Sequence, residues 1–543
     1  MTRSPAREYP TSRPGAPSFW QQLPTPALLI TLGIVLRLIP YAANPSLAHD
    51  EATQALGILG QSYHELSESF ASIEPAGIGF LYLQKAATHL LGPSEYALRL
   101  LPLLAAALAV PLYWLPARRI TGQDARRPAL WGLALMSLAL PLISSAAEAG
   151  PAAIDVGLSL LVVHLALRVL DRTSWGGPGH GGGADALAIA GGFAIWCSPL
   201  CNCLLPAIVA VLLLTALRRG NARNTIIGAG VGCFWLLNFA AHHYLMALRA
   251  AVLDPASSGQ LDSLPLFLPH FSYEHLTAMP HAAFAALRAI TGGATFPWPV
   301  TVAGVLLAGA LACLGLVHLW RANQRAFWLL LIAILAIVLV PCLTGAGGKE
   351  GHARMAAPLL ALLIAAGLQF LGTLRSTRRL ALIGGTLVLL PALAAAAITI
   401  VPRSHDEIRP LVAHIAAQKT NADVVYLLGD SAPAFRYYMM YRPAFSVRPL
   451  VIAVGPSDLD TKAYRAGRIN EAAILRDITA PLREEMSTRH PPQVPKVWIV
   501  FAGTAHHDYA GQETKVVAGL DAMGKRRDEI HQVGTAAYLY ELP

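Results

Sequence analysis

Residues 97–117 read ALRLLPLLAAALAVPLYWLPA, an almost wholly apolar run that Arg118 and Arg119 follow directly. A helix rises about 1.5 Å per residue, so a run of this length crosses the roughly 30 Å hydrocarbon core of a bilayer. The stretch therefore predicts a membrane-spanning helix, and much of the chain repeats its pattern.

The composition supports this interpretation. The chain has 543 residues, 55% of them hydrophobic and 13% charged, with a mean hydropathy of +0.48. A soluble domain carries about 25% charged residues, so an ordinary cytosolic enzyme and a disordered chain are both excluded. Residues 403–543 hold 17 basic and 16 acidic residues, whereas the first 402 hold 24 and 16. This contrast predicts a polytopic α-helical membrane protein with a soluble C-terminal domain.

Apolar runs of about 17–25 residues mark the predicted spans. There are eleven of them, near residues 25–43, 97–117, 128–147, 152–170, 185–200, 202–217, 224–244, 298–320, 326–344, 355–372 and 380–400. The two segments at 185–200 and 202–217 are barely long enough.

The turns between the spans alternate in charge. Arginines gather in the N-terminal tail and in every second turn, at positions 3, 7, 13, 118, 119, 126, 127, 218, 219, 223, 321, 325, 375, 378 and 379. The positive-inside rule places these turns and the tail (1–24) in the cytoplasm. A transmembrane domain (25–402) then has its first periplasmic loop at 44–96, and residues 403–543 lie in the periplasm. The net charge of +9 is expected to reflect this asymmetry, and no nucleic-acid partner is expected.

Two segments outside the spans have their own patterns. The run 76–91 is apolar but short and contains Gln84, Lys85 and His89, which predicts an amphipathic helix in the far interface. The tail alternates strand-like runs (423–428, 496–501, 535–541) with helical ones (406–418, 432–441, 511–524). We expect a small α/β domain that serves as a lid or an acceptor-binding module.

Ionisable residues gather on the side opposite the arginines. Such groups are costly near a membrane unless they are paired or face a cavity, so each is a functional candidate. They are His49, Asp50, Glu51, Glu74, Glu148, Asp155, Lys349, Glu350, His352 and Arg354. Their occurrence on one side predicts a site there.

Each candidate also has a structural interpretation. Asp50 and Glu51 would cap a helix that begins at Ala52. Glu148 and Asp155, seven residues apart, would be interface anchors and share a helix face only if Pro151 leaves the helix intact. Arg354 would be a flank that snorkels toward the interface.

The order and spacing of these residues resemble the GT-C glycosyltransferases, in particular the family 39-like group of protein O-mannosyltransferases and lipid A aminoarabinose transferases. The resemblance rests on His49-Asp-Glu-Ala52, Glu74-Pro-Ala-Gly77, the stretch from Leu91-Gly92 to Arg99-Leu100, the segment Glu148 to Asp155, and Arg354 with Pro358. One departure stands out. Members often have Arg or Lys and then Tyr after the acidic residue that ends the third span, whereas this chain reads Glu148-Ala-Gly150-Pro-Ala152.

The resemblance implies an inverting transferase in the bacterial inner membrane. It would move a sugar from a polyprenyl-phosphate donor to a hydroxyl of a glycan, lipid or protein acceptor on the periplasmic face. Asp50 would be the general base and Glu51 its orienting partner. Arg354 and Lys349 would bind the donor phosphate. The remaining candidates, His49, Glu74, Glu148, Asp155 and His352, would bind substrate.

Three points stay open from the sequence. The carboxylate cluster would alternatively hold a divalent metal through its oxygens, and no other cofactor is implied. A lipid or polysaccharide transporter is a rival function, although transporters often show internal repeats that this chain lacks. A catalytically inactive assembly partner is the other rival, because the cation after Glu148 is missing.

Overall fold

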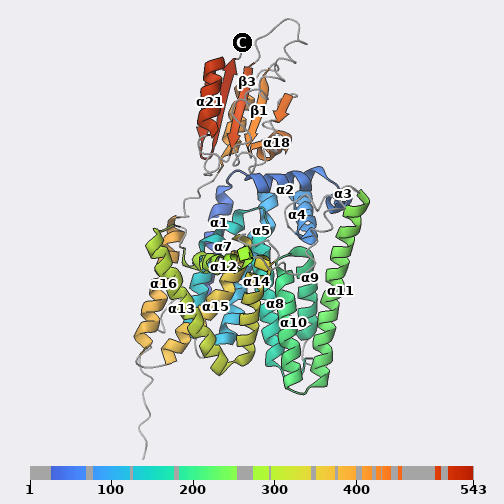
Figure 1. Ribbon diagram of the computed structural model, residues 1–543, viewed down its shortest axis with the longest axis vertical. Coiled ribbons are helices and arrows are strands. Elements are labelled where there is room, and N and C mark those ends of the chain that lie inside the picture. The colour runs from blue at the N-terminus through green and yellow to red at the C-terminus, as the bar shows by residue number, and fades with distance from the viewer. Residues whose placement is uncertain are drawn as a thin grey trace, which may run out of the picture.

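The computed structural model describes residues 26–68, 77–122, 126–175, 183–253, 273–292, 295–343, 350–373, 377–398, 406–418, 423–429, 431–441, 451–454, 496–502 and 512–541. Within these residues a helical bundle carries a small sheet domain at one end (Figure 1).

Eight of the described helices are long and apolar enough to cross a bilayer. They are α1 (Pro26–Ala43), α5 (Glu95–Thr121), α8 (Ala152–Asp171), α10 (Cys201–Arg218), α11 (Ala222–Leu253), α13 (Trp298–Ala322), α15 (Glu350–Thr373) and α16 (Arg378–Ile398). Each coincides with a predicted span.

Three further segments occupy the other predicted spans. α6 (Arg126–Leu138) meets α7 (Leu140–Ser144) and the short 3₁₀ helix η3 (Ser145–Ala147) at a bend of 58°, and the bent pair passes as one span. α9 (Gly183–Cys197) and α14 (Gln324–Leu343) are apolar. However, α9 and the stretch Gln324–Leu339 of α14, whose side chains the structure describes, are shorter than the eight. The polytopic helical architecture is confirmed, and the count of eleven depends on these shorter helices.

The bend between α6 and α7 has an identifiable cause. Pro141 has no N–H, so the Ser137 carbonyl loses the donor that a regular helix would supply. Arg37, fully buried on α1, donates instead to the carbonyls of Ser137 at 3.3 Å and Met136 at 3.0 Å. The bend therefore keeps its hydrogen bonds satisfied in an apolar setting and leads the chain into the turn at 145–150.

Small residues let the central helices approach closely. A Cβ at Gly315 on α13 would lie 2.9 Å from the Leu363 carbonyl carbon on α15, and Gly367 faces Gly315 in the same way. Such small-residue contacts are typical of helices that associate within membranes. They place α15, most of whose length is buried, at the centre of the bundle.

One end of the bundle is rich in arginine, and we call it the arginine pole. There the Arg119 guanidinium pairs with Asp171 at 2.7 Å, joining the ends of α5 and α8. Arg219 and Arg325 both donate to the Leu170 carbonyl, at 3.0 and 2.9 Å. These bonds bring together the turns that the charge pattern assigns to one side.

The opposite end, which we call the α2 pole, carries the non-spanning helices α2 (His49–Gly60), α3 (Tyr63–Glu68) and α4 (Ile78–Leu91). In Figure 1, α2 lies across this end of the bundle, beneath the sheet domain. α4 corresponds to the amphipathic helix predicted at 76–91, and it buries its polar residues Gln84, Lys85 and Thr88. The helix α12 (Tyr273–Thr291) completes the described helices of the bundle.

The described part of the C-terminal region forms a five-stranded mixed sheet in the order β2-β1-β3-β5-β4. The strands are β1 (Val424–Gly429), β2 (Val451–Val454), β3 (Lys496–Ala502), β4 (Lys525–Gln532) and β5 (Thr535–Glu541). β1 is parallel to β2 and β3, whereas β5 is antiparallel to β3 and β4. The predicted α/β domain is confirmed, together with its three predicted strands.

The alternation of side chains along the strands gives the sheet two apolar faces. One face, with Tyr426, Ile499 and Tyr538, packs on α21 (Gln512–Met523). The other face, with Trp498, belongs to the same apolar cluster as α17 (Ile408–Gln418), α18 (Ser431–Tyr441) and the bundle itself. The sheet domain is thus continuous with the bundle through α17 and α18.

Candidate functional site

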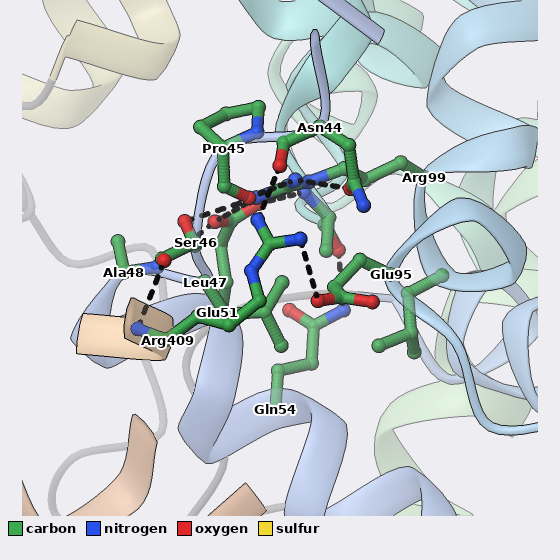
Figure 2. Close-up of polar contacts among 12 residues, drawn as sticks. Asn44, Pro45, Ser46, Leu47, Ala48, Glu51, Gln54, Glu95, Arg99 and Arg409 are labelled. Atoms are coloured by element: carbon green, nitrogen blue, oxygen red, sulfur yellow. Dashed lines mark hydrogen bonds and ion pairs between the residues drawn. The ribbon is translucent and has the colours of Figure 1, made fainter. Parts of the chain in front are cut away.

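The site is built around the short loop that joins α1 to α2. Asn44 has a positive φ of 46°, a left-handed conformation that asparagine tolerates better than most residues. The guanidinium of Arg99, on α5, donates to the Asn44 side-chain oxygen at 3.2 Å and to the Pro45 carbonyl at 2.7 Å (Figure 2). Arg99 is only 1% exposed, so it holds the loop from within the bundle.

Glu51, in the first turn of α2, is the counter-ion of this buried arginine. Its Oε2 lies 2.8 Å from Arg99 Nη2 and also accepts the Ala48 N–H at 3.0 Å, which caps α2. Its Oε1 accepts the Ala149 N–H from the turn that follows η3. Both carboxylate oxygens are therefore occupied, and Glu51 ties α2, α5 and this turn together.

Asp50, the adjacent residue, is in a different situation. It also lies in the first turn of α2, but its side chain is exposed and makes no hydrogen bond or ion pair with any residue that the structure describes. Asp50 therefore offers an accessible carboxylate on a helix that Glu51 holds rigidly.

The peptide group of Ala149 links α2 and α4 to the turn that carries Glu148. Its N–H is bound by Glu51, and its carbonyl accepts from the side-chain amides of Gln54 at 2.9 Å and Gln84 at 2.8 Å. The two amides also bond to each other at 2.6 Å, and both side chains are buried. A buried hydrogen-bond network of this kind fixes the turn in one position.

Glu148 projects from this turn and forms an ion pair with Arg354, in the second turn of α15. The two side chains are 35% and 16% exposed, so the pair borders solvent. A Cβ at Gly351, at the start of α15, would lie 3.5 Å from Leu200 in the α9–α10 turn. The start of α15 thus lies between the α9–α10 turn and the turn that carries Glu148.

Asp155 does not share a helix face with Glu148. α8 begins at Ala152, after a turn that contains Pro151, so the helix that would align the two carboxylates is interrupted. The Asp155 side chain is only 3% exposed, at the start of α8. Its Oδ1 has no hydrogen-bond partner among the described residues.

Close backbone contact brings the start of α4 to the same place. A Cβ at Gly77 would lie 2.7 Å from the Cys197 carbonyl carbon, and one at Gly79 would lie 2.9 Å from the Cys197 thiol. Any side chain at Gly77 would displace the backbone at the end of α9. These glycines therefore allow α4 to lie against α9 beside the site.

The predicted site residues have the following positions. Asp50, Glu51, Glu148, Asp155 and Arg354 lie at the α2 pole, and His49 and His352 lie beside them, both partly exposed. Glu74 and Lys349 lie outside the described residues, as does the side chain of Glu350. Sequence reasoning gave no role to Arg99, Gln54 or Gln84, although a charge inside an apolar span and buried amides are both signals of a fixed polar network.

The possibility of a metal site gains no support from the geometry. Within the part of the chain that the structure describes, no three His, Cys, Asp or Glu side chains converge as a ligand set. Glu51 and Glu148 already bind arginines. We therefore derive no chemical step that uses a metal.

Comparison with known proteins agrees with this architecture. The family described as dolichyl-phosphate-mannose-protein mannosyltransferase matches residues 75–244, which include α4, α5 and the Glu148 turn. No curated protein sequence matches the chain.

Two solved proteins share the fold over nearly the whole chain. The crystal structure of ArnT from Cupriavidus metallidurans in the apo state aligns with a TM-score of 0.56 at 15% identity and covers 94% of this chain and 97% of that one. The same protein bound to undecaprenyl phosphate aligns with a TM-score of 0.54, again at 15% identity and with the same coverage. The archaeal oligosaccharyltransferase AglB from Archaeoglobus fulgidus, in complex with an inhibitory peptide and a dolichol-phosphate, aligns with a TM-score of 0.51 at 11% identity and covers 96% and 74%.

These matches confirm the predicted resemblance at the level of the fold. The chain has the fold of the GT-C glycosyltransferase superfamily, and ArnT and AglB are two solved proteins to which it is similar.

Proposed function

We propose that this chain is a membrane glycosyltransferase that moves a sugar from a polyprenyl-phosphate donor to a hydroxyl acceptor, with inversion, at the α2 pole. The fold supports a glycosyltransferase, and one protein with this fold has been solved with undecaprenyl phosphate and another with dolichol-phosphate. Phosphate lipids are therefore the class of donor that we expect here.

The observation that carries the proposal is the contrast between Asp50 and Glu51. Glu51 uses both oxygens within the protein, whereas the Asp50 carboxylate is exposed and has no partner among the described residues. A general base must reach the acceptor hydroxyl and have a lone pair available. Asp50 meets this requirement, and Glu51 serves as the positioning residue beside it.

The step that follows is a single displacement. Asp50 accepts the proton of the acceptor hydroxyl. The oxygen of that hydroxyl attacks the anomeric carbon of the sugar from the face opposite the phosphate. The bond between the anomeric carbon and the phosphate oxygen breaks, and the lipid phosphate leaves with the electron pair. Arg354, in the second turn of α15 at the α2 pole, stabilises the negative charge that develops on the phosphate. We assign Lys349, five residues earlier, to the same phosphate.

The other candidate residues are proposed to bind the substrates. We propose that Glu148 gives up Arg354 to the donor phosphate or binds a sugar hydroxyl, and that His49 and His352 bind substrate beside it. We propose the same for Glu74 and for the buried carboxylate of Asp155. The acceptor is a glycan, lipid or protein hydroxyl.

We place the protein in the bacterial inner membrane, with the N-terminus in the cytoplasm and the α2 pole and sheet domain in the periplasm. The support is the set of arginines at the opposite end, such as Arg219 and Arg325, which the positive-inside rule assigns to the cytoplasm.

The test is transfer from a panel of synthetic undecaprenyl-phosphate sugars by purified full-length protein, wild type against Asp50→Asn. Asp185→Asn is the matched control, because Asp185 is an exposed aspartate in the first turn of α9, near the arginine pole. We expect Asp50→Asn to lower kcat by about 10²- to 10⁴-fold, as for loss of a general base. The control should retain full activity.

Other results would point elsewhere. Transfer or donor hydrolysis that survives in Asp50→Asn would keep the enzyme and overturn its base. Donor binding without turnover, with every sugar and acceptor class tested, would favour an inactive assembly partner. Movement of labelled lipid across vesicles without cleavage would favour a transporter.

A further inference from the structure

The sheet domain meets the bundle at the loop that leads into α2. Glu407, just before α17, accepts hydrogen bonds from the Ser46 hydroxyl at 2.6 Å and the Ser46 N–H at 3.3 Å. The Ser46 hydroxyl oxygen in turn accepts a hydrogen bond from the backbone N–H of Arg409 at 3.2 Å. The start of α17 and the α1–α2 loop thus each donate hydrogen bonds to the other, although more than 360 residues separate them in the sequence.

Two further side chains of the sheet domain bind the same loop. Arg409 donates to the Asn44 carbonyl, and its Nη1 lies 3.7 Å from the carboxylate of the fully buried Glu95 on α5 (Figure 2). The hydroxyl of Tyr438, on α18, accepts the Leu47 N–H at 2.9 Å. Burial raises the pKa of Tyr438. We call Glu407, Arg409 and Tyr438 the loop latch.

The polar groups of the loop backbone are shared between the two domains. The bundle supplies Arg99, for the Pro45 carbonyl, and Glu51, for the Ala48 N–H. The loop latch supplies partners for the Asn44 carbonyl and for the N–H groups of the next two buried residues, Ser46 and Leu47. Asp50 lies two residues beyond this loop.

The loop latch is itself anchored to the sheet. The Glu407 N–H donates to the Val533 carbonyl at 2.8 Å, and the Thr535 hydroxyl donates to the Glu407 carbonyl at 3.0 Å. Val533 and Thr535 lie in and directly after the β4–β5 turn. A shift of the sheet would therefore pull directly on the loop.

We propose that the sheet domain positions the proposed catalytic base, with Glu407, Arg409 and Tyr438 as positioning residues that hold the loop ahead of Asp50. The proposal rests on the function proposed above, and it gives the domain a role other than that of a lid. A reacting group must be held within a fraction of an ångström, and a misplacement of about 1 Å can cost about 10²-fold in rate. Three backbone groups of this loop, the Asn44 carbonyl and the Ser46 and Leu47 N–H groups, have their partners in the sheet domain.

The experiment compares Arg409→Ala and Arg409→Lys with wild type in the full-length protein. Arg527→Ala is the matched control. Arg527 lies on the edge strand β4 of the same sheet and pairs with Glu541 on β5. Three quantities are measured: hydrogen exchange of residues 44–52 by mass spectrometry, affinity for undecaprenyl phosphate, and kcat for transfer. A merely structural defect in the protein would change all three together.

For Arg409→Ala we expect faster exchange confined to residues 44–52 and a fall in kcat of roughly 10- to 100-fold, with lipid-phosphate affinity kept within about twofold. Arg409→Lys, which retains the charge opposite Glu95, should recover part of the rate. Arg527→Ala should match wild type in all three.

The proposal is overturned if exchange at 44–52 is unchanged in Arg409→Ala, whatever the activity, or if exchange rises while kcat stays at the wild-type value. Glu407→Ala, which removes only the Ser46 contacts, is the second variant should Arg409→Ala fail to fold, and the same criteria apply to it. If the wild type transfers no sugar, the proposed function fails on its own, and with it the positioning role; the exchange data then decide only whether the loop latch holds the loop.

Discussion

Two acid–arginine pairs at the α2 pole resemble each other in the sequence and differ in the structure. Glu51 pairs with Arg99 and Glu148 pairs with Arg354, and both pairs join segments far apart in the chain. In the first pair the arginine is 1% exposed and the carboxylate 13%. In the second pair the figures are 16% and 35%.

This difference in burial indicates a structural ion pair in the first case and an exchangeable ion pair in the second. A buried pair whose oxygens and N–H groups are all bonded has no role left except to hold its neighbours in place. A pair at the solvent border loses little when one member changes partner, because water and a substrate phosphate can replace the lost contact. We therefore expect the Glu51–Arg99 pair to hold the site in place and the Glu148–Arg354 pair to exchange with a ligand.

The largest expected effect comes from breaking the buried pair. Arg99→Leu leaves Glu51 charged without its counter-ion, which we expect to cost about 3–5 kcal/mol in the free energy of unfolding. Removing both charges, in Arg99→Leu with Glu51→Leu, should recover part of that loss, because no unpaired charge remains. Chemical unfolding in detergent micelles measures both.

Arg354→Leu is the comparison variant, and we expect its cost to stay near 1 kcal/mol or less. Equal costs for Arg99→Leu and Arg354→Leu would show that burial does not distinguish the two pairs.

The second prediction tests the partly buried pair of Glu148 and Arg354 through ligand binding. Arg354→Gln should weaken the affinity for undecaprenyl phosphate about tenfold, since a charge-assisted hydrogen bond to phosphate is lost. Glu148→Gln should strengthen it, because the carboxylate that now neutralises the arginine is removed. Titration of the purified variants with undecaprenyl phosphate tests both directions.

Arg379→Gln, at the arginine pole, is the control for charge alone and should leave this affinity unchanged. Opposite signs for the Arg354 and Glu148 variants would support an exchangeable pair. Weakening in both would instead show that the intact ion pair is needed for the shape of the site.

The third prediction concerns the link between the two pairs. Gln84→Leu removes the hydrogen bonds of Gln84 to the Ala149 and Leu98 carbonyls and its bond with Gln54, while Gln54 still donates to Ala149. We therefore expect a loss of about 1–2 kcal/mol. The turn that carries Glu148 should then exchange amide hydrogens faster, and transfer should slow. Gln369→Leu is the matched control, since Gln369 donates to the Thr121 carbonyl at the arginine pole. If the two variants lower transfer equally, the network has no special connection to the site.

Much of the architecture follows from local sequence signals. Span length, loop charge and the continuous apolar run of the strand at 496–502 depend on residues close together in the chain, so local composition reveals them. β4, which reads KRRDEIHQ, escaped prediction because an edge strand with one exposed face and many charges lacks the apolar alternation of a strand.

The site was only partly predictable, for a physical reason. Asp50 and Glu51 are adjacent acidic residues in the sequence. In the structure they differ because Arg99, on α5, and Ala149, in the turn after η3, both bind Glu51. Glu407 and Arg409 looked like ordinary charges of a soluble domain, because their partner loop lies more than 360 residues away. Arg99 offered the clearest overlooked signal, a charge within the apolar run at 97–117.

The smallest expected effect extends the comparison to a pair in open solvent. Arg526 and Tyr540 bond to Asp521 beside the edge strand β4, and the Arg526 bond in particular holds the pKa of Asp521 below its usual 3.8. A carboxyl whose pKa is lowered by folding adds stability above the pKa of the unfolded chain, and that stability is lost as the pH falls through the folded value. The wild-type sheet domain should therefore weaken below about pH 4, and Asp521→Asn should show less of this dependence. The measure is pepsin cleavage within residues 512–541, compared between the two proteins at each pH from about 4 to 2. Because the Asp521 and Arg526 side chains are 42% and 34% exposed, the difference should be well below that of Arg99→Leu, and a steeper acid response in Asp521→Asn would contradict the assignment.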